Sequence, residues 1–289
     1  MADQANPVNP ARRSRPVPRK STRLHPDFAT ILGLVLAFGG IVGGLIMEGG
    51  KLQDISQLTA AIIVLGGTFG AVMVSTPMNV LTGAARRLVH VFLDQIESPD
   101  SAIEELIGYA ASARRSGLVA LEDDAMQIQD PFLRKALNLA VDGTDLQEIR
   151  TMMQLEIELG EDQALAEARV FECAGGYAPT IGIIGAVMGL IQVMKNLANI
   201  AEVGHGIAVA FVATVYGVGL ANVVLLPAAS KIKARIESET ALKELKLEGV
   251  VGIVEGMNPK VIRHKLEAYQ RQTKKAQQTN PRARNEAAA

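Results

Sequence analysis

The sequence predicts an all-α polytopic membrane protein with four transmembrane helices and a helical cytoplasmic domain between the second and third helices. Four runs contain no Asp, Glu, Lys or Arg, and together they hold 101 of the 289 residues: 28–47, 55–85, 173–194 and 203–230. All 59 charged side chains therefore lie in the other 188 residues. No alternating pattern of useful length predicts a strand, so only helices remain.

Each charge-free run is long enough to cross a membrane, because a hydrocarbon core about 30 Å thick needs roughly 20 apolar residues in a helix. One such run alone could be a buried core helix, but four runs in one chain favour membrane spans. The first run is too long for the apolar part of a cleavable signal peptide, and residues 47–50 offer no small-x-small cleavage site. We therefore expect a retained signal anchor.

The basic residues near the span ends predict the orientation. The first 27 residues carry six basic residues, whereas the connections at 48–54 and 195–202 hold one lysine each. Five further basic residues follow the second and fourth runs: Arg86, Arg87, Lys231, Lys233 and Arg235. Because Lys and Arg accumulate on the cytoplasmic side, we expect both termini and segment 86–172 to be cytoplasmic.

The formal net charge of −1 hides segments of opposite sign. Segment 86–172 has eight basic and 18 acidic residues, whereas 1–27 carries +4 and 231–289 carries +6. Basic segments beside a membrane are expected from anionic lipid alone. The predicted division is a disordered basic tail 1–26, transmembrane helices in 27–85, a cytoplasmic helical domain 86–172, transmembrane helices in 173–230, a cytoplasmic helical region 231–269 and a disordered tail 270–289.

Helix start and stop signals occur throughout the cytoplasmic segment. Ser98 and Asp130 are each followed by a proline, as is typical of an N-cap and first helical turn, and Gly143 is placed to end the second of these helices. A third apolar pattern begins after Thr144. We expect it to stop near Gly160, with a further helix running into the third span.

Small residues are spaced four apart in all four predicted spans. The pairs are Gly39 with Gly43, Gly40 with Gly44, Gly66 with Gly70, Gly185 with Gly189, and Gly217 with Ala221. Such spacing lets helix backbones approach closely, so the accumulation of pairs predicts tight packing of the spans.

Helix-breaking and polar residues gather in the third and fourth spans. Pro179 and Pro227 each free a backbone carbonyl inside an apolar helix, and Thr180 and Thr214 add hydroxyls. Tyr216 and Asn222 add further polar groups. These side chains could merely satisfy local carbonyls, but their concentration in two spans favours a polar pathway.

The spans contain no Asp, Glu, Lys or Arg of their own, and His205 lies at a span edge. Ion relays through membranes normally need an intramembrane carboxylate, so a partner protein must supply it if ions cross here. The single cysteine excludes an internal disulfide, and neither metal-ligand spacing nor a nucleophile with its base is present. We therefore expect no enzyme activity, no cofactor and no nucleic-acid partner.

Nine motifs, in order along about residues 24–269, resemble the MotA/PomA family of flagellar stator proteins. They are LHPDFATILG (24–33), EGG (48–50), IVLGGTFG (63–70), ARRSGLVALE (113–122), VDGT (141–144), APTIGIIGAVMGLI (178–191), ATVYG (213–217), LEGV (247–250) and EGMNP (255–259). The arginine-rich tail before residue 24 lies outside the pattern. Order and coverage make a chance similarity improbable.

The resemblance implies a bacterial inner-membrane motor. In this family, five copies of the four-span subunit surround two copies of a MotB-like single-span partner whose aspartate carries the ion. Ion flow turns the pentamer, and its cytoplasmic domains pass torque to the rotor protein FliG. The resemblance thus implies a partner that carries the carboxylate absent from the spans of this chain. It also implies lipid, other copies of the chain in a homopentamer, and FliG as partners.

Matching motifs also imply roles for nine residues. They are Thr180, Ala186 and Thr214 along the ion pathway, Pro179 and Pro227 in conformational coupling, and Arg114, Arg115, Glu122 and Asp123 at the rotor contact. Sodium-driven members tend to carry a hydroxyl where this chain has Ala186, and sodium needs hard oxygen ligands. The expected ion is therefore the proton, with sodium as the alternative.

Two other functions stay open at this point. Energisers of the ExbB/TolQ type share the paired spans but typically have three of them, so a count of four speaks against that class. A passive membrane scaffold or channel would act without a partner that carries a carboxylate. It differs from a stator in needing only this chain for full activity.

Overall fold

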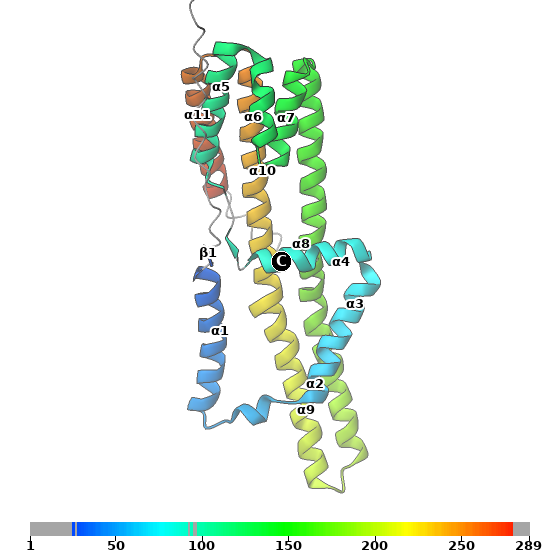
Figure 1. Cartoon of the computed structure of the whole chain (residues 1–289). Helices are drawn as coiled ribbons and strands as arrows, with labels where there is room; N and C mark the ends of the chain where they lie inside the picture. Colours follow the sequence, from blue (N-terminus) through cyan, green and yellow to red (C-terminus); the bar gives the residue numbers. More distant parts are fainter. Residues whose placement is uncertain (1–24, 27, 92, 95–96, 280–289) are drawn as a thin grey trace, which may run out of the picture.

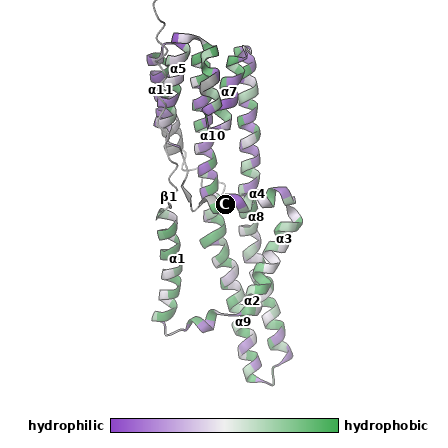
Figure 2. Ribbon diagram, in the orientation of Figure 1, coloured by the Kyte–Doolittle hydropathy of each residue, from purple (hydrophilic) through white to green (hydrophobic). Residues whose placement is uncertain are grey.

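The computed structural model describes residues 25–26, 28–91, 93–94 and 97–279, and they form an elongated bundle of helices (Figure 1). One half is apolar on its surface and the other is largely hydrophilic (Figure 2). We call these the apolar half and the helical domain. The tails 1–24 and 280–289 lie outside the described residues, so the disorder expected there stays a prediction.

Four helical segments in the described chain are long and apolar enough to cross a membrane, as predicted. They are α1 (Phe28–Met47), the run α2–η2–α3 (Leu58–Ala61, Ile62–Gly66 and Gly67–Ser75), α8 (Leu146–Lys195), and the run α9–η4–α10 (Ile200–Gly219, Leu220–Leu225 and Leu226–Val254). Figure 1 shows α1 standing apart from the other three, and none of its residues is buried. A short 3₁₀ helix, η1 (Leu52–Ile55), connects α1 to the second span.

The second span is shorter than its charge-free run suggests. Helix α3 ends at Ser75, ten residues before the expected end at 85, because Pro77 cannot continue the helix and the preceding Thr76 is extended. The chain then turns into α4 (Met78–Val91), which crosses the long helices near the boundary between the two halves (Figure 1). Residues 78–85 are therefore not part of the span.

Helix α4 is fixed to the long helices by charge and close contact. The Arg87 guanidinium donates a hydrogen bond to Glu167 of α8 and lies 3.8 Å from the Glu239 carboxylate of α10. A Cβ at Gly83 would overlap the Glu167 carboxylate, so a larger residue there would require the Glu167 side chain to move. The buried Glu167 of α8 is thereby paired with a cation where α4 crosses that helix.

The helical domain starts where the sequence signals predict. In α5 (Pro99–Ser116) the Ser98 side chain accepts a hydrogen bond from the Ser101 amide, and in α7 (Pro131–Val141) Asp130 accepts one from the Phe132 amide. Gly143 follows α7 with a φ of 75°. The remaining elements are η3 (Leu118–Leu121), α6 (Glu122–Gln127) and α11 (Pro259–Thr279), with an antiparallel pairing of β1 (His25–Pro26) and β2 (Leu93–Asp94).

Two helices extend further than expected. Helix α8 runs unbroken for 50 residues through Gly160, because flanking residues pack on α10 on both sides and outweigh the roughly 1 kcal/mol that glycine costs in a helix. Helix α11 continues to Thr279, so residues 270–279 are helical where disorder was expected. Good helix formers dominate that stretch.

Large parts of segments 86–172 and 231–269 share one hydrophobic core. Buried side chains from α5, α7, α8, α10 and α11 contact one another, among them Leu106, Leu137, Ile149, Val250 and Ile262. The two segments that the sequence analysis describes separately therefore contact each other through this core. The basic C-terminal segment packs against the acidic one, and their opposite charges meet.

Candidate functional site

The third and fourth spans meet through glycines that leave no room for a side chain. A Cβ at Gly182 would lie 2.9 Å from the Ala213 carbonyl oxygen, and one at Gly189 would lie 2.7 Å from the Gly206 oxygen. One at Gly217 would lie 2.5 Å from the Ala178 oxygen. The predicted close packing is confirmed for this pair of helices.

The glycine pairs of the first span behave differently. Gly39, Gly43, Gly40 and Gly44 have nothing within 4 Å of a Cβ position, and the same holds for Gly66 and Gly70 in the second span. These surfaces are open in the single chain. The predicted close packing therefore does not occur there within one copy.

Pro179 and Thr180 lie inside α8 without ending it. Proline has no N–H to give to the Gly175 carbonyl four residues earlier, and the Thr180 hydroxyl donates to the Tyr177 carbonyl at 2.8 Å. Thr180 is exposed on the surface of the chain. A hydroxyl already bonded to its own helix can still accept a hydrogen bond from a passing water or hydronium.

Thr214 and Ala186 lie close to the same level on the facing helices. The Thr214 Cα is 3.5 Å from the Cβ position of Gly182, two residues beyond Thr180. Ala186 follows Gly185, whose Cβ position is 2.8 Å from the Ala213 Cβ. The half-buried Thr214 donates its hydroxyl to the Ala210 carbonyl at 3.1 Å. The structure thus brings the three predicted pathway residues onto one helix pair.

Pro227 follows a wide turn of the fourth span. The π-helical segment η4 ends at Leu225, and Pro227 stands in the first turn of α10. A π segment redistributes backbone hydrogen bonds, which offsets the N–H that Pro227 lacks. On the facing helix, a Cβ at Gly175 would lie 2.7 Å from the Leu226 side chain. The two turns altered by proline are therefore direct neighbours.

Tyr216 ties the fourth span to the start of the second. Its hydroxyl donates to the Ile55 carbonyl at 2.5 Å and accepts from the Gln57 amide at 3.4 Å. Asn222 donates only to the Val218 carbonyl of its own helix. Asn222 thus satisfies a local carbonyl, whereas Tyr216 joins two spans through its hydroxyl.

Arg114 and Arg115 end α5 at the tip of the helical domain, far from the α8–α9 hairpin (Figure 1). Arg115 donates from Nε to the Ala111 carbonyl at 3.1 Å. Arg114 is exposed and takes part in none of the ion pairs formed by the described residues. Of these two neighbouring arginines, only Arg115 is thus seen to bond to its own helix.

Glu122 begins α6, where a carboxylate is favourable beside the helix N-terminus. It is exposed, while the preceding Leu121 is fully buried and anchors the turn. Asp123 follows in the first turn of α6, and its side chain lies outside the described residues. Arg114 and Glu122 therefore project opposite charges from the two ends of one short connection.

Lys246 holds the N-termini of two helices against α10. Its side chain is 4% exposed, and its ammonium group donates to Glu97, which precedes α5, at 2.6 Å and to Asp130, the N-cap of α7. Burial alone would lower the pKa of Lys246, but its bonds to Asp130 and Glu97 outweigh burial and raise that pKa. Burial would likewise raise the pKa of Asp130, and the bond from Lys246 lowers it instead. Sequence reasoning missed this cluster because its members are separated by more than 100 residues.

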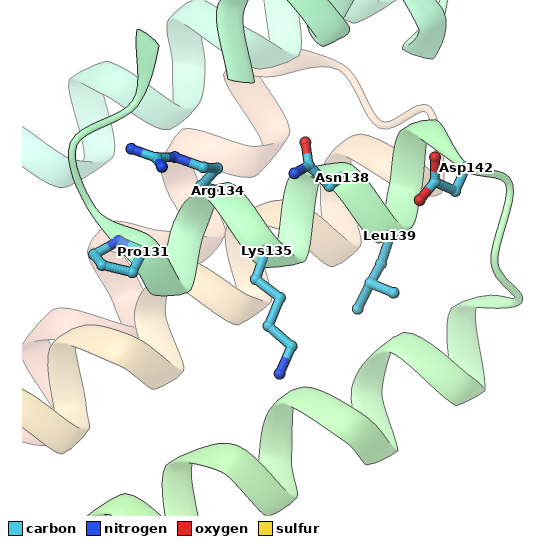
Figure 3. A pocket seen from close by; sticks show the side chains of 6 residues that line it. All are labelled: Pro131, Arg134, Lys135, Asn138, Leu139 and Asp142. Carbon is cyan, nitrogen blue, oxygen red and sulfur yellow. The ribbon is translucent and has the colours of Figure 1, made fainter. Parts of the chain in front are cut away.

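A hollow of about 300 Å³ lies along α7 (Figure 3). Both cations there are engaged: Lys135 pairs with Glu156 at 2.5 Å, and Arg134 donates to the Ile128 carbonyl at 2.9 Å. The described residues also contain no group of three or more His, Cys, Asp or Glu side chains arranged to hold a metal ion. The candidate site residues predicted from the sequence lie in the third and fourth spans and around the α5–α6 connection.

Comparison with known proteins agrees with this arrangement. The motility protein A N-terminal family matches residues 31–113, and the MotA/TolQ/ExbB proton channel family matches residues 124–245. Motility protein A from Bacillus subtilis (strain 168) is 37% identical over 247 residues, which cover 84% of this chain and 90% of that protein.

Two solved structures share the fold. The structure of C. jejuni MotAB aligns with a TM-score of 0.80 at 34% identity, covering 84% of this chain and 95% of that chain. The flagellar MotAB stator complex from Bacillus subtilis aligns with a TM-score of 0.77 at 36% identity, covering 83% and 94%. The chain therefore belongs to the MotA/PomA branch of the MotA/TolQ/ExbB proton channel family, whose members are ion-channel subunits and not enzymes.

Proposed function

We propose that this chain is the four-span subunit of an ion-driven flagellar stator. Five copies surround two copies of a MotB-like single-span partner in the bacterial inner membrane, and proton flow drives rotation that acts on the rotor protein FliG. The observation that carries the proposal concerns the third and fourth spans, which combine hydroxyls with Pro179 and Pro227 and hold no Asp, Glu, Lys or Arg in their charge-free runs. A route of this kind functions only when another chain brings the carboxylate.

The open surfaces of the first span support an assembly of several copies. Helix α1 buries none of its residues within one chain, and its four paired glycines face open space. Glycine faces at this spacing are suited to a neighbouring helix. Neighbouring copies and lipid together would cover α1.

Each site residue then has a defined task. Thr180 and Thr214 line the route of the ion beside Ala186, whose missing hydroxyl favours protons over sodium. Pro179 and Pro227 let the two spans bend when the partner's carboxylate changes charge. Arg114, Arg115, Glu122 and Asp123 meet charges of opposite sign on FliG.

The four candidate spans favour this function over an ExbB/TolQ energiser, which typically has three. In the proposed topology both termini and the helical domain are cytoplasmic, as the basic residues predict. A reporter enzyme fused after residue 52 checks this, because an outside location fits four spans and a cytoplasmic location fits three.

Co-purification tests the assembly. The chain is expressed together with an affinity-tagged MotB-like protein, extracted from the membrane and weighed intact by native mass spectrometry. We expect five copies of this chain with two of the partner. A complex without the partner, or full ion conduction by this chain alone in liposomes, would instead support the passive channel.

A further inference from the structure

A small apolar pocket opens at the tip of the helical domain, between the last turn of α5 and the end of α10. Its volume is about 180 Å³. Buried Ala110 and Ile253 form its floor, and half-buried apolar side chains form its walls. These wall residues are Ala113, Leu118, Val254 and Met257.

The mouth of the pocket is kept open by two glycines. Gly117 ends α5 with a φ of +84°, and Gly256 follows α10 with a φ of +68°. Neither has any atom within 4 Å of a Cβ position. Because other L-residues rarely adopt this conformation, both turns favour glycine, which has no side chain that could obstruct the mouth.

One charge borders this mouth. Arg114 lines the pocket, is exposed and makes no ion pair within the described chain, whereas Arg115 beside it is held by the Ala111 carbonyl. Helices α5 and α10 both end here, so their partial negative charges disfavour an anion inside the pocket itself. An acidic group is favoured only at the guanidinium of Arg114, and the pocket suits an uncharged apolar group.

The volume limits what can enter. Pockets for small molecules typically measure about 300–1,000 Å³, so this one fits a single side chain better than a metabolite. Protein interfaces commonly depend on one apolar anchor in such a pocket beside a charged residue. This combination indicates a protein partner.

We propose that the pocket receives one large apolar side chain of FliG while a carboxylate on the same FliG segment pairs with Arg114. The inference rests on the proposed stator function and adds an apolar anchor to a contact otherwise made by charges. Charge reversal at Arg114 removes the pairing, and filling the pocket removes the anchor.

The test fills the pocket without changing charge. Ala113→Leu adds a branched side chain to the pocket wall, and Ala268→Leu makes the same change at an exposed position of α11 as a control. Binding of fluorescently labelled FliG is measured by anisotropy on the complete stator complex in nanodiscs. We expect Ala113→Leu to weaken binding about tenfold and Ala268→Leu to leave it unchanged.

Further variants distinguish the possible failures. If Ala113→Leu lowers the yield of complex, Leu118→Ala removes part of the wall without adding volume and must also weaken binding. If Arg114→Glu abolishes binding of FliG but neither pocket variant changes it, the proposed role of the pocket is overturned. The proposed stator function is then unaffected. No binding of FliG by the unmodified complex overturns both proposals, and equal loss for Ala268→Leu overturns the specific role of the pocket.

Discussion

At the scale of single residues, Arg114 and Arg115 show how far neighbours in sequence can differ. The guanidinium of Arg115 is held by its own helix, whereas that of Arg114 is free to meet another molecule. The bond from Nε holds the Arg115 guanidinium close to its own helix and restricts its reach, although the two terminal nitrogens can still donate to another group. Torque at the α5–α6 connection should therefore depend more on Arg114.

Reversing these charges tests the difference. Arg114→Glu places like charges against an acidic partner, and we expect stall torque to fall roughly tenfold. Arg115→Glu should have a smaller effect, and Glu122→Lys should resemble Arg114→Glu. Torque is measured on beads attached to single motors, with the membrane level of the chain as a control. Undiminished torque in both Arg114→Glu and Glu122→Lys would remove these residues from the contact.

The prolines of the spans allow a second test at this scale. Pro179→Ala restores the N–H that can reach the Gly175 carbonyl, so α8 becomes more regular and harder to bend. We expect Pro179→Ala and Pro227→Ala to block rotation while membrane insertion stays normal. Pro131→Ala, in the first turn of α7 where proline is compatible with a helix, is the matched control. Normal swimming with alanine at both span positions would contradict the coupling role.

The prolines and hydroxyls could be selected from sequence because a polar or helix-breaking residue in an apolar run is conspicuous. The residues that surround them in space could not be predicted from the sequence. That Gly175 packs against Leu226, beside Pro227, depends on the register of two long helices. The pocket beside Arg114 likewise joins residues about 140 positions apart along the chain.

At the scale of elements, the α8–α9 pair depends on glycine at its contact. Gly217→Ala would place a Cβ 2.5 Å from the Ala178 carbonyl oxygen, where only the backbone could yield. We expect this change to lower the recovered amount of assembled complex several-fold. Gly219→Ala, where nothing lies within 4 Å, should leave recovery unchanged or raise it slightly. Equal recovery of both variants in size-exclusion chromatography would argue against a tight contact.

Lys246 governs how α5 and α7 sit on α10. Lys246→Met leaves the Asp130 and Glu97 carboxylates without their cation, and because both are partly exposed to solvent the expected loss is about 1–3 kcal/mol, less than for a fully buried pair. The melting temperature of the purified complex should fall by several degrees. Lys260→Met, at an exposed position of α11, is the control and should not change it.

The pH dependence follows from the directions of the two pKa shifts. Asp130 has a lowered pKa, so it contributes stability above its unfolded pKa near 3.9, and this is lost as pH falls through the folded pKa. Lys246 has a raised pKa, so its contribution is complete below about 10.4 and is lost as pH rises through the folded value. The difference between Lys246→Met and the unmodified chain should thus be constant from about pH 5 to 9.

At the scale of the whole molecule, the four spans could be predicted because charge is excluded from lipid. The end of the second span could not be placed, since α4 opens with uncharged residues and its first arginine appears only at position 86. The core shared by parts of segments 86–172 and 231–269 could not be predicted either. This core and the ion pairs around it join residues that are distant in sequence, such as Lys246 with Asp130.

Opposite charges meet around the core that these segments share. The net charge of −10 in segment 86–172 faces basic residues of α10 and α11, including the bidentate pair of Arg263 with Glu104. Lys265 and Arg150 both contact Glu248, whose pKa burial alone would raise but these two cations lower. The charge separation found along the sequence is largely cancelled in space.

Which ion is conducted is a property of the assembled complex. With alanine at position 186, the α8–α9 pair offers few oxygens to replace the water shell of sodium. We expect swimming speed to be independent of sodium concentration at fixed pH and to fall when the proton gradient is collapsed. A steep requirement for sodium would refute the proton assignment.

The unbroken length of α8 has a mechanical consequence. From Pro179 to the start of α8 at Leu146 the helix extends roughly 50 Å, at about 1.5 Å per residue. A bend of about 5° at Pro179 would therefore displace the far end by roughly 4 Å, close to the rise of one helical turn. Since α5, α7, α10 and α11 share a core with that end, the whole helical domain would move with it. A bend that is too small to disturb packing in the membrane would thus move the tip that bears Arg114 by a distance comparable to the spacing between side chains.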